Sequence, residues 1–187
     1  MTRPPVLIAI DVQIGFLEPA WGATDNPAAE NNIRSLIARW RGLEWPLVLV
    51  RHDSLQQGSP LSPTNPGNAF QEGIYGPHDL LVTKSVNSAF YGEPDLHQWL
   101  RDNGHTEVVI CGLTTNHCCE TTARMAGNLG YDVTFVADAM RTFDRKHPDG
   151  FLISAAEIAR SSAASLHGEF ATVTTTAEVL ATFADSV

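Results

Sequence analysis

Runs of aliphatic residues recur along the chain, and stretches with helical periodicity or a long polar loop separate them. The first run, Val6 to Ile10, contains no polar residue, which is typical of a parallel strand buried on both faces. Further strands are predicted at 46–50, 80–83, 108–111, 133–136 and 170–173, and helices at 33–40, 95–103, 118–129, 152–166 and 177–183. This alternation predicts one α/β domain over residues 1–187, a three-layer α/β/α fold with a six-stranded, mainly parallel sheet.

One segment between the predicted strands has no regular pattern. Residues 53–78 are rich in Pro, Gly, Ser and Asn, and a loop of this length inside a compact domain is usually functional. We expect this loop, together with residues 85–92, to build a ligand pocket.

The charge balance narrows the class of partner. Lys and Arg number 12 against 21 Asp and Glu, which gives a formal charge of −9. Nucleic acid and anionic membranes need a basic surface, so neither is expected as the main partner. Val6–Ile10 is too short for the apolar core of a signal peptide. The three cysteines form neither a C-x-x-C pair nor a disulfide framework. We therefore expect a cytoplasmic protein that binds a small molecule.

Three reactive side chains follow three of the predicted strands. Asp11 follows the first, Lys84 the third, and Cys118 lies shortly after the fourth. Taken singly, the carboxylate could cap a loop, the lysine could reach solvent, and the cysteine could be a small hydrophobic residue. Together they lie where parallel sheets place their ligand sites, at the carboxyl ends of the strands.

The chemistry of these three residues is complementary. A thiolate is the reactive form of cysteine, and a helix N-terminus or a nearby cation lowers the thiol pKa. Cys118 is expected in the first helical turn with Thr115 or Asn116 as the cap, while Lys84 supplies the cation. Asp11 could take the thiol proton and pass it to a leaving amine. His117 is a rival base, but a residue adjacent to the nucleophile normally points away from it.

Four segments carry a resemblance to a known family. They are Ile10-Asp11-Val12-Gln13-x-Gly15-Phe16, Lys84-Ser85-x-Asn87-Ser88-Ala89-Phe90, Cys111-Gly112-Leu113-Thr114-Thr115-Asn116-His117-Cys118-Cys119-Glu120-Thr121-Thr122-Ala123-Arg124 and Leu129-Gly130-Tyr131-Asp132-Val133. With this order of Asp, Lys and Gly-x-Thr-x-x-x-Cys, the chain resembles the isochorismatase-like superfamily of cysteine hydrolases. That superfamily includes nicotinamidases and N-carbamoylsarcosine amidohydrolases.

The resemblance implies a Rossmann-like fold and an Asp11–Lys84–Cys118 triad. Cys118 would attack an amide-type carbonyl, a thioester would form as the amine leaves, and water would release the acid. A cis peptide between Leu113 and Thr114 would aim the amides of Thr114 and Cys118 at the oxyanion.

The resemblance also bears on the pocket and on assembly. Phe16 matches a pocket aromatic of the family, although core packing explains it equally well; Trp21 and Tyr91 are further candidates for the wall, and core packing is the stronger explanation for Trp21. Family members are commonly homo-oligomers, so we expect a dimer or tetramer. A helix face of small residues would permit close packing between copies: Ala155, Ala156, Ala159 and Ala163.

Two departures from the family pattern separate the branches. Nicotinamidases have a metal site after the second strand, with an aspartate two residues before a histidine and a further histidine soon after. Here Asp53 follows His52, and no second histidine comes before His78. Adjacent side chains of an extended chain point to opposite faces, so we expect no metal and no cofactor. Isochorismatases proper cleave a vinyl ether without the cysteine, so the presence of Cys118 favours the amidases.

The leading hypothesis is thus a metal-independent cysteine hydrolase that cleaves the C–N bond of a small amide, lactam, ureide or carbamoyl compound. One alternative is a vinyl-ether hydrolase in which Asp11 protonates the substrate and Cys118 is a bystander. A second is a non-catalytic binding protein, whose mark would be a broken triad. A third is redox sensing by Cys118 and Cys119, which a strained disulfide between neighbours disfavours.

Overall fold

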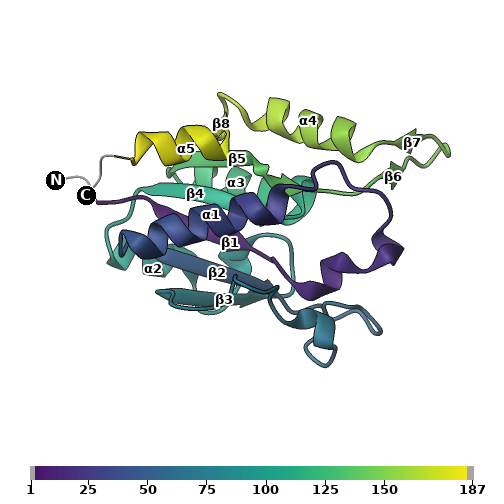
Figure 1. Ribbon diagram of the computed structural model, residues 1–187, viewed down its shortest axis with the longest axis horizontal. Coiled ribbons are helices and arrows are strands. Elements are labelled where there is room, and N and C mark those ends of the chain that lie inside the picture. Colours follow the sequence, from purple (N-terminus) through teal and green to yellow (C-terminus); the bar gives the residue numbers. More distant parts are fainter. Residues whose placement is uncertain (1–2, 185–187) are drawn as a thin grey trace.

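The computed structural model describes residues 3–184, and all six predicted strands pair in one sheet (Figure 1). The strands are β1 (Val6–Ile10), β2 (Leu47–His52), β3 (Leu80–Lys84), β4 (Glu107–Leu113), β5 (Asp132–Arg141) and β8 (Thr172–Thr174). Their order is β3-β2-β1-β4-β5-β8, and every neighbouring pair is parallel. The predicted sheet is confirmed; residues 1–2 and 185–187 of the predicted domain lie outside the described part.

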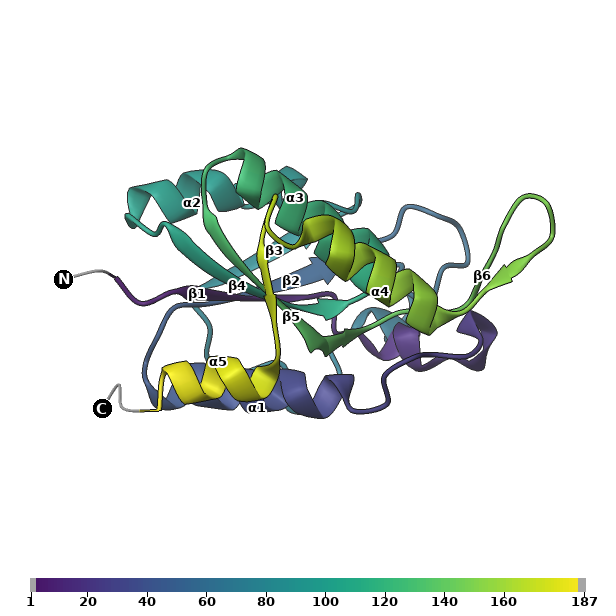
Figure 2. The same cartoon turned by 90° about the horizontal axis from the view of Figure 1, so that it is seen from above.

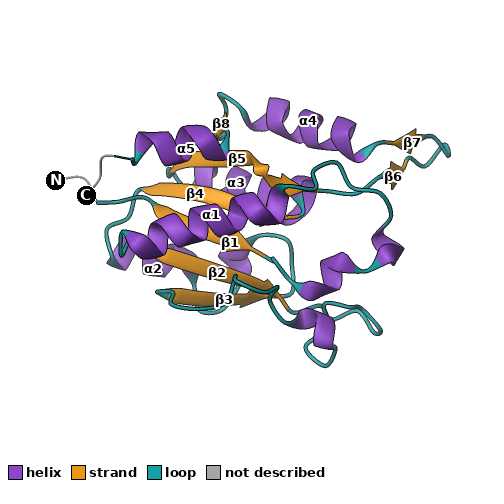
Figure 3. Cartoon of the chain, in the orientation of Figure 1, coloured by secondary structure: helices purple, strands orange, loops and turns teal. Residues whose placement is uncertain are grey.

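Helices form a layer on each face of the sheet (Figures 2 and 3). One layer holds α1 (Ala29–Gly42) and α5 (Thr176–Thr182); the other holds α2 (Leu96–Asp102), α3 (Glu120–Asn128) and α4 (Ala155–Leu166). Short helical turns follow several strands: η1 (Ile14–Leu17), η2 (Pro19–Trp21), η3 (Pro66–Asn68), η4 (Ala89–Tyr91) and the π-turn η5 (Thr115–Cys119). No helix within residues 3–184 is long and apolar enough to cross a membrane.

The amphipathic pattern of α1 explains how its layer packs. Ile33, Leu36, Ile37 and Trp40 recur at helical spacing and are all buried. They pack in one core cluster with Leu7 and other side chains from the same face of the sheet. Ile8, the next residue of β1, belongs to the core cluster on the opposite face. The central strand is therefore apolar throughout because both of its faces are covered.

Strand β5 is longer than the sequence predicts. It was expected at 133–136 but runs to Arg141, with a shift in its register against β4 between Ile110 and Gly112. Asp138 interrupts the apolar pattern because its carboxylate accepts hydrogen bonds from Thr176 at the start of α5. The predicted end of this strand is therefore wrong.

A two-stranded hairpin lies before helix α4 and includes residues 152 and 153, which were predicted to begin the helix over 152–166. β6 (Arg145–Lys146) pairs antiparallel with β7 (Leu152–Ile153) and extends away from the sheet (Figure 2). The expectation of a helix from residue 152 is wrong, because α4 begins at Ala155 behind a capping box formed by Ser154 and Glu157. Residues 170 and 171, expected in the last strand, precede β8.

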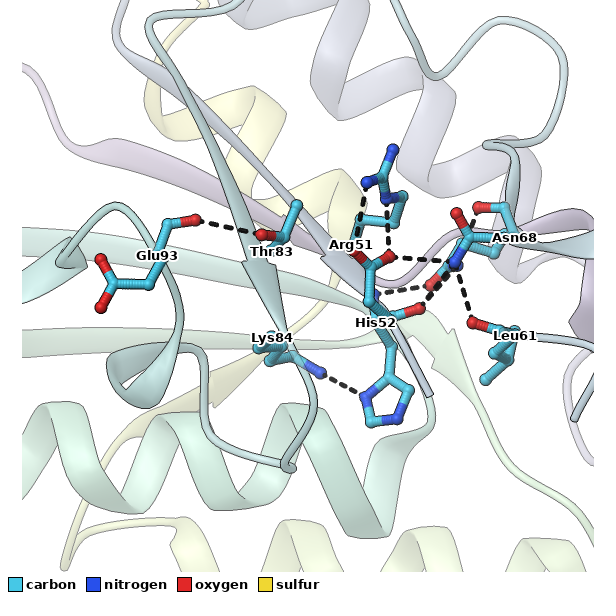
Figure 4. Close-up of polar contacts among 9 residues, drawn as sticks. Arg51, His52, Leu61, Asn68, Thr83, Lys84 and Glu93 are labelled. Atoms are coloured by element: carbon cyan, nitrogen blue, oxygen red, sulfur yellow. Dashed lines mark hydrogen bonds and ion pairs between the residues drawn. The ribbon is translucent and has the colours of Figure 1, made fainter. Parts of the chain in front are cut away.

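The edge strand β3 carries a short partner at its carboxyl end. Thr83 and Glu93 exchange two backbone N–H···O=C hydrogen bonds of 2.8 Å in an isolated antiparallel bridge. The side chain of Thr83 adds a bond to the same carbonyl (Figure 4). This bridge lies directly before Lys84, the last residue of β3. The end of the strand is therefore bonded to β2 on one side and to Glu93 on the other.

Candidate active site

The predicted reactive residues meet at the carboxyl edge of the sheet. The chain moves from β1 to β2 and β3 on one side and to β4, β5 and β8 on the other, so the order of strands reverses between β1 and β4. Ligands of open parallel sheets bind at such a reversal. Asp11 follows β1 and Cys118 follows β4, while Lys84 ends β3 in register with His52 of β2.

Asp11 is held by a sharp turn at the end of β1. Its backbone has φ 53°, a left-handed conformation that Asp adopts more readily than most residues, and its N–H donates to Val50. Two residues later, the Gln13 side chain donates to the carbonyl of His52 at 3.0 Å and accepts from its N–H at 2.8 Å. The ends of β1 and β2 are thereby tied together.

The approach to Cys118 depends on a glycine. Gly112 has φ 130°, and a Cβ there would lie 2.1 Å from the carbonyl oxygen of Ile10 on the neighbouring strand. The chain then passes through a cis peptide between Leu113 and Thr114, the bond that the resemblance implied, and enters η5. Cys118 therefore lies next to the end of β1.

The local structure around Cys118 differs from the expected helix start. Cys118 lies in the π-turn η5, and α3 begins only at Glu120. Neither expected cap is present: η5 has no side-chain cap, and Oδ1 of the Asn116 side chain instead accepts a 2.5 Å hydrogen bond from the hydroxyl of Thr142. The prediction of a helix-capping Thr115 or Asn116 is therefore wrong. The turn is anchored to the end of β5 instead.

The carboxylate, ammonium and thiol are neighbours in the interior. Nζ of Lys84 lies 2.5 Å from Oδ2 of Asp11, and both side chains are fully buried. The second oxygen, Oδ1 of Asp11, is buried and has no hydrogen-bond partner among residues 3–184. Sγ of Cys118, a carboxylate oxygen of Asp11 and a ring nitrogen of His52 all lie within 4.8 Å of one another. The structure thus brings the predicted triad together.

The electrostatics of the triad correct one expectation. Burial opposes the charge of Lys84, but the Asp11 carboxylate and Cys118 outweigh it, so the pKa of Lys84 is raised and the ammonium persists. Burial and then the Asp11 charge raise the pKa of Cys118 well above its usual value, although Lys84 opposes them. The expectation of a lowered pKa for Cys118 is therefore wrong: burial and the Asp11 charge favour the neutral thiol.

The triad opens onto a small pocket. A cavity of about 120 Å³ lies above Cys118 and has nine lining residues: Phe16, Trp21, His52, Leu61, Asn87, Thr114, His117, Cys118 and Arg145. Phe16 and Trp21 form its aromatic wall, with ring centroids 5.2 Å apart. Tyr91 is 71% exposed and does not line the pocket. Substrate contact by Phe16, Trp21 or Tyr91 stays a prediction.

The pocket contains residues that the sequence did not assign to it. Leu61 and Asn87 come from the two loops that were expected to build the pocket, and Oδ1 of Asn87 lies 3.8 Å from Sγ of Cys118. His117 was expected to point away from the nucleophile but lines the pocket. Arg145, on β6, was not singled out.

The segment after β2 does not fit a metal site. Asp53 is bound to Arg51 at 2.9 Å and to Asn68 at 3.0 Å, whereas His52 points to Lys84, with 3.3 Å between Nδ1 and Nζ (Figure 4). His78 precedes β3 and so lies at its opposite end. Among residues 3–184, the one convergent ligand set is Asp11, His52 and Cys118. The ammonium of Lys84 already lies 2.5 Å from Asp11 and 3.3 Å from His52, so two of these three side chains contact a cation of the protein itself.

Comparison with known proteins agrees with this geometry. The family model "Isochorismatase domain" matches residues 5–178. The isochorismatase family protein YrdC of Bacillus subtilis is 40% identical over 185 residues, which cover 98% of each chain. Nicotinamidase 3 of Arabidopsis thaliana is 40% identical over 86 residues, 46% of this chain and 42% of that protein. A crystal structure from Chromobacterium violaceum, of a hydrolase of the isochorismatase family, superposes with a TM-score of 0.92 at 37% identity and covers 97% of this chain and 94% of that one. The chain therefore belongs to the isochorismatase family and is a hydrolase.

Proposed function

We propose that this hydrolase cleaves a C–N bond of a small amide, lactam, ureide or carbamoyl compound through a thioester on Cys118, without a metal. The observation that carries the proposal is the position of the Cys118 thiol. It lines the pocket on one side and meets the buried Asp11–Lys84 pair on the other. The similarity to a protein named nicotinamidase supports an amide as the bond cleaved.

In the acylation step the neutral thiol is activated as it attacks. Oδ1 of Asp11, which is buried without a partner, takes the thiol proton while Sγ bonds to the carbonyl carbon. The C=O electron pair moves onto oxygen, where the amides of Thr114 and Cys118 would stabilise it. When the oxyanion collapses, the C–N bond breaks and Asp11 gives its proton to the leaving amine.

In the deacylation step the same carboxylate acts on water. Asp11 takes a proton from the water that attacks the thioester carbonyl, and the C–S bond breaks as that proton returns to sulfur. Lys84 remains protonated throughout, because Asp11 and Cys118 raise its pKa. Its positive charge compensates the buried carboxylate and the negative charge that develops on sulfur.

The vinyl-ether alternative leaves the Cys118 thiol without a role in the reaction. Asp11 is fully buried and is not among the residues that line the pocket, whereas Cys118 is. The reactive group that borders the pocket is therefore the thiol, which favours covalent catalysis. The intact triad is likewise the opposite of what a non-catalytic homologue would show.

The test is a panel of small primary amides and ureides, monitored for ammonia. We expect the native protein to release ammonia and C118A to release none, while D11N loses about 100-fold or more in rate. Acid quenching followed by peptide mass spectrometry should find an acyl group on Cys118. Unchanged ammonia release by C118A would refute the cysteine mechanism, and cleavage of a vinyl ether by C118A would establish the alternative.

A further inference from the structure

The guanidinium of Arg145 lies in the wall of the Cys118 pocket without an acidic partner. Arg145 begins β6, and the hairpin brings it to the pocket from outside the main sheet. Its Nη2 lies 3.4 Å from Nδ1 of His117, and its Nε is buried with no hydrogen-bond partner among residues 3–184. The guanidinium at the pocket wall therefore has a neutral imidazole as its side-chain contact and hydrogen-bonding capacity that is not used within residues 3–184.

Two other arginines at this edge of the sheet are neutralised. Arg141, at the end of β5, forms a 2.7 Å ion pair with Glu30, and Arg51, near the end of β2, forms a 2.9 Å ion pair with Asp53. No Asp or Glu lines the Cys118 pocket, and Asp11, next to Cys118, is already paired with Lys84. Within residues 3–184, Arg145 forms no ion pair of 4 Å or less, so its charge in the pocket is uncompensated.

The neighbouring histidine positions the guanidinium without adding charge. Burial is the larger cause, and the charge of Arg145 the second, that lowers the pKa of His117. The ring is therefore neutral, and its Nδ1 can accept a hydrogen bond from Nη2 of Arg145. His52 across the pocket is also neutral, because burial and Lys84 lower its pKa. Arg145 is therefore the one full charge exposed to a ligand among the lining residues.

We propose that Arg145 binds a carboxylate of the substrate, so that the substrate is a small amide or carbamoyl compound bearing a carboxylate. This inference rests on the proposed function, which places the scissile carbonyl at Cys118. A guanidinium binds a carboxylate through two parallel N–H···O bonds, and the two terminal nitrogens of Arg145 carry N–H groups for such a pair. The small cavity holds the anionic group and the reacting carbonyl within one short molecule, against the apolar side chains of Phe16, Trp21 and Leu61.

The first experiment compares substrates of equal shape and different charge. Succinamate and succinamide, or malonamate and malonamide, differ only in a carboxylate against a carboxamide. The kcat/KM of the diamide is first divided by two, because it has two equivalent amides. We then expect the native kcat/KM to favour the anion by roughly 10- to 100-fold, the range of charge-assisted hydrogen bonds. R145Q should lose this preference, R145K should keep part of it, and the exposed neighbour variant K146Q should keep all of it.

A second experiment needs no turnover. Iodoacetate and iodoacetamide both alkylate Sγ of Cys118 with loss of iodide, and they differ in the same charged group. We measure the alkylation rate with iodoacetate divided by the rate with iodoacetamide, by mass spectrometry of the Cys118 peptide. This ratio should fall about tenfold in R145Q, the effect of losing one ion pair in a partly buried site. K146Q should leave the ratio unchanged, and thermal melts would establish that each variant is folded.

The two readouts separate the two proposals. If no amide is hydrolysed but the alkylation ratio falls in R145Q, the carboxylate site stands and the proposed amidohydrolase activity fails. If amides are hydrolysed without charge preference and the alkylation ratio is the same in R145Q, the activity stands and the role of Arg145 is overturned. The role of Arg145 would also be overturned if R145Q and R145K lost activity equally on the charged and the neutral substrate and the alkylation ratio were unchanged. That pattern marks a purely structural residue.

Discussion

Replacing Lys84 by Met should destabilise the fold as well as abolish catalysis. The Lys84–Asp11 pair has a 2.5 Å contact and no solvent exposure on either side chain. K84M keeps most of the apolar stem but leaves the Asp11 carboxylate buried without a cation. Breaking a buried pair on one side costs about 3–5 kcal/mol. For a chain of 187 residues this corresponds to a drop in Tm of roughly 6–20 °C.

The double variant D11N/K84M supplies the decisive comparison. It removes both charges and leaves two neutral side chains of similar volume, so no uncompensated ion remains. Replacing a whole buried pair by neutral groups is often neutral or stabilising. We therefore expect its free energy of unfolding to return to within about 1 kcal/mol of the native value, although it is inactive.

Urea unfolding followed by tryptophan fluorescence would measure these free energies. K146M, which removes an exposed ammonium, is the matched control and should stay within about 0.5 kcal/mol of the native protein. If K84M is as stable as the native protein, or if the double variant is as unstable as K84M, an uncompensated Asp11 charge is not the cause.

Three further predictions concern the cysteines and the metal. Burial and Asp11 raise the pKa of Cys118, so its thiolate absorbance should be absent below about pH 9 and rise only above it. C118A serves as the blank. A thiolate signal at neutral pH would contradict this. Cys119 is fully buried in the core, so C119A should keep most of the activity that C118A loses, and iodoacetamide should label Cys118 first; prior labelling of Cys119 would reverse the assignment. The Lys84 ammonium already contacts Asp11 and His52, so activity should survive EDTA and gel filtration. One zinc or iron per chain, with activity lost on chelation and restored by metal, would refute this.

The parts of the fold predictable from sequence are those set by burial. Val6–Ile10 is apolar throughout because both faces of β1 are covered, and the strand has the predicted bounds. The convergence of Asp11, Lys84 and Cys118 follows from parallel topology, because the carboxyl ends of parallel strands share one edge of the sheet.

The parts that sequence could not supply depend on polar contacts across the chain. Asp138, within β5, accepts hydrogen bonds from Thr176 at the start of α5, and this polar residue interrupts the apolar pattern from which the strand was predicted. Arg145 was not singled out from the sequence, because the longer strand β5 and the hairpin that bring it to the pocket were not predicted. The raised pKa of Cys118 required the depth of its burial, which residue spacing does not contain.

The bridge between Thr83 and Glu93 has a consequence for self-association. An edge strand with free N–H and C=O groups is a template onto which a strand of another molecule can add. At the end of β3 these groups of Thr83 are already occupied by Glu93 of the same chain. A second molecule therefore cannot continue the sheet at this point, and copies that assemble must use other surfaces. The strand that carries Lys84 is thus shielded from edge-to-edge aggregation at its carboxyl end.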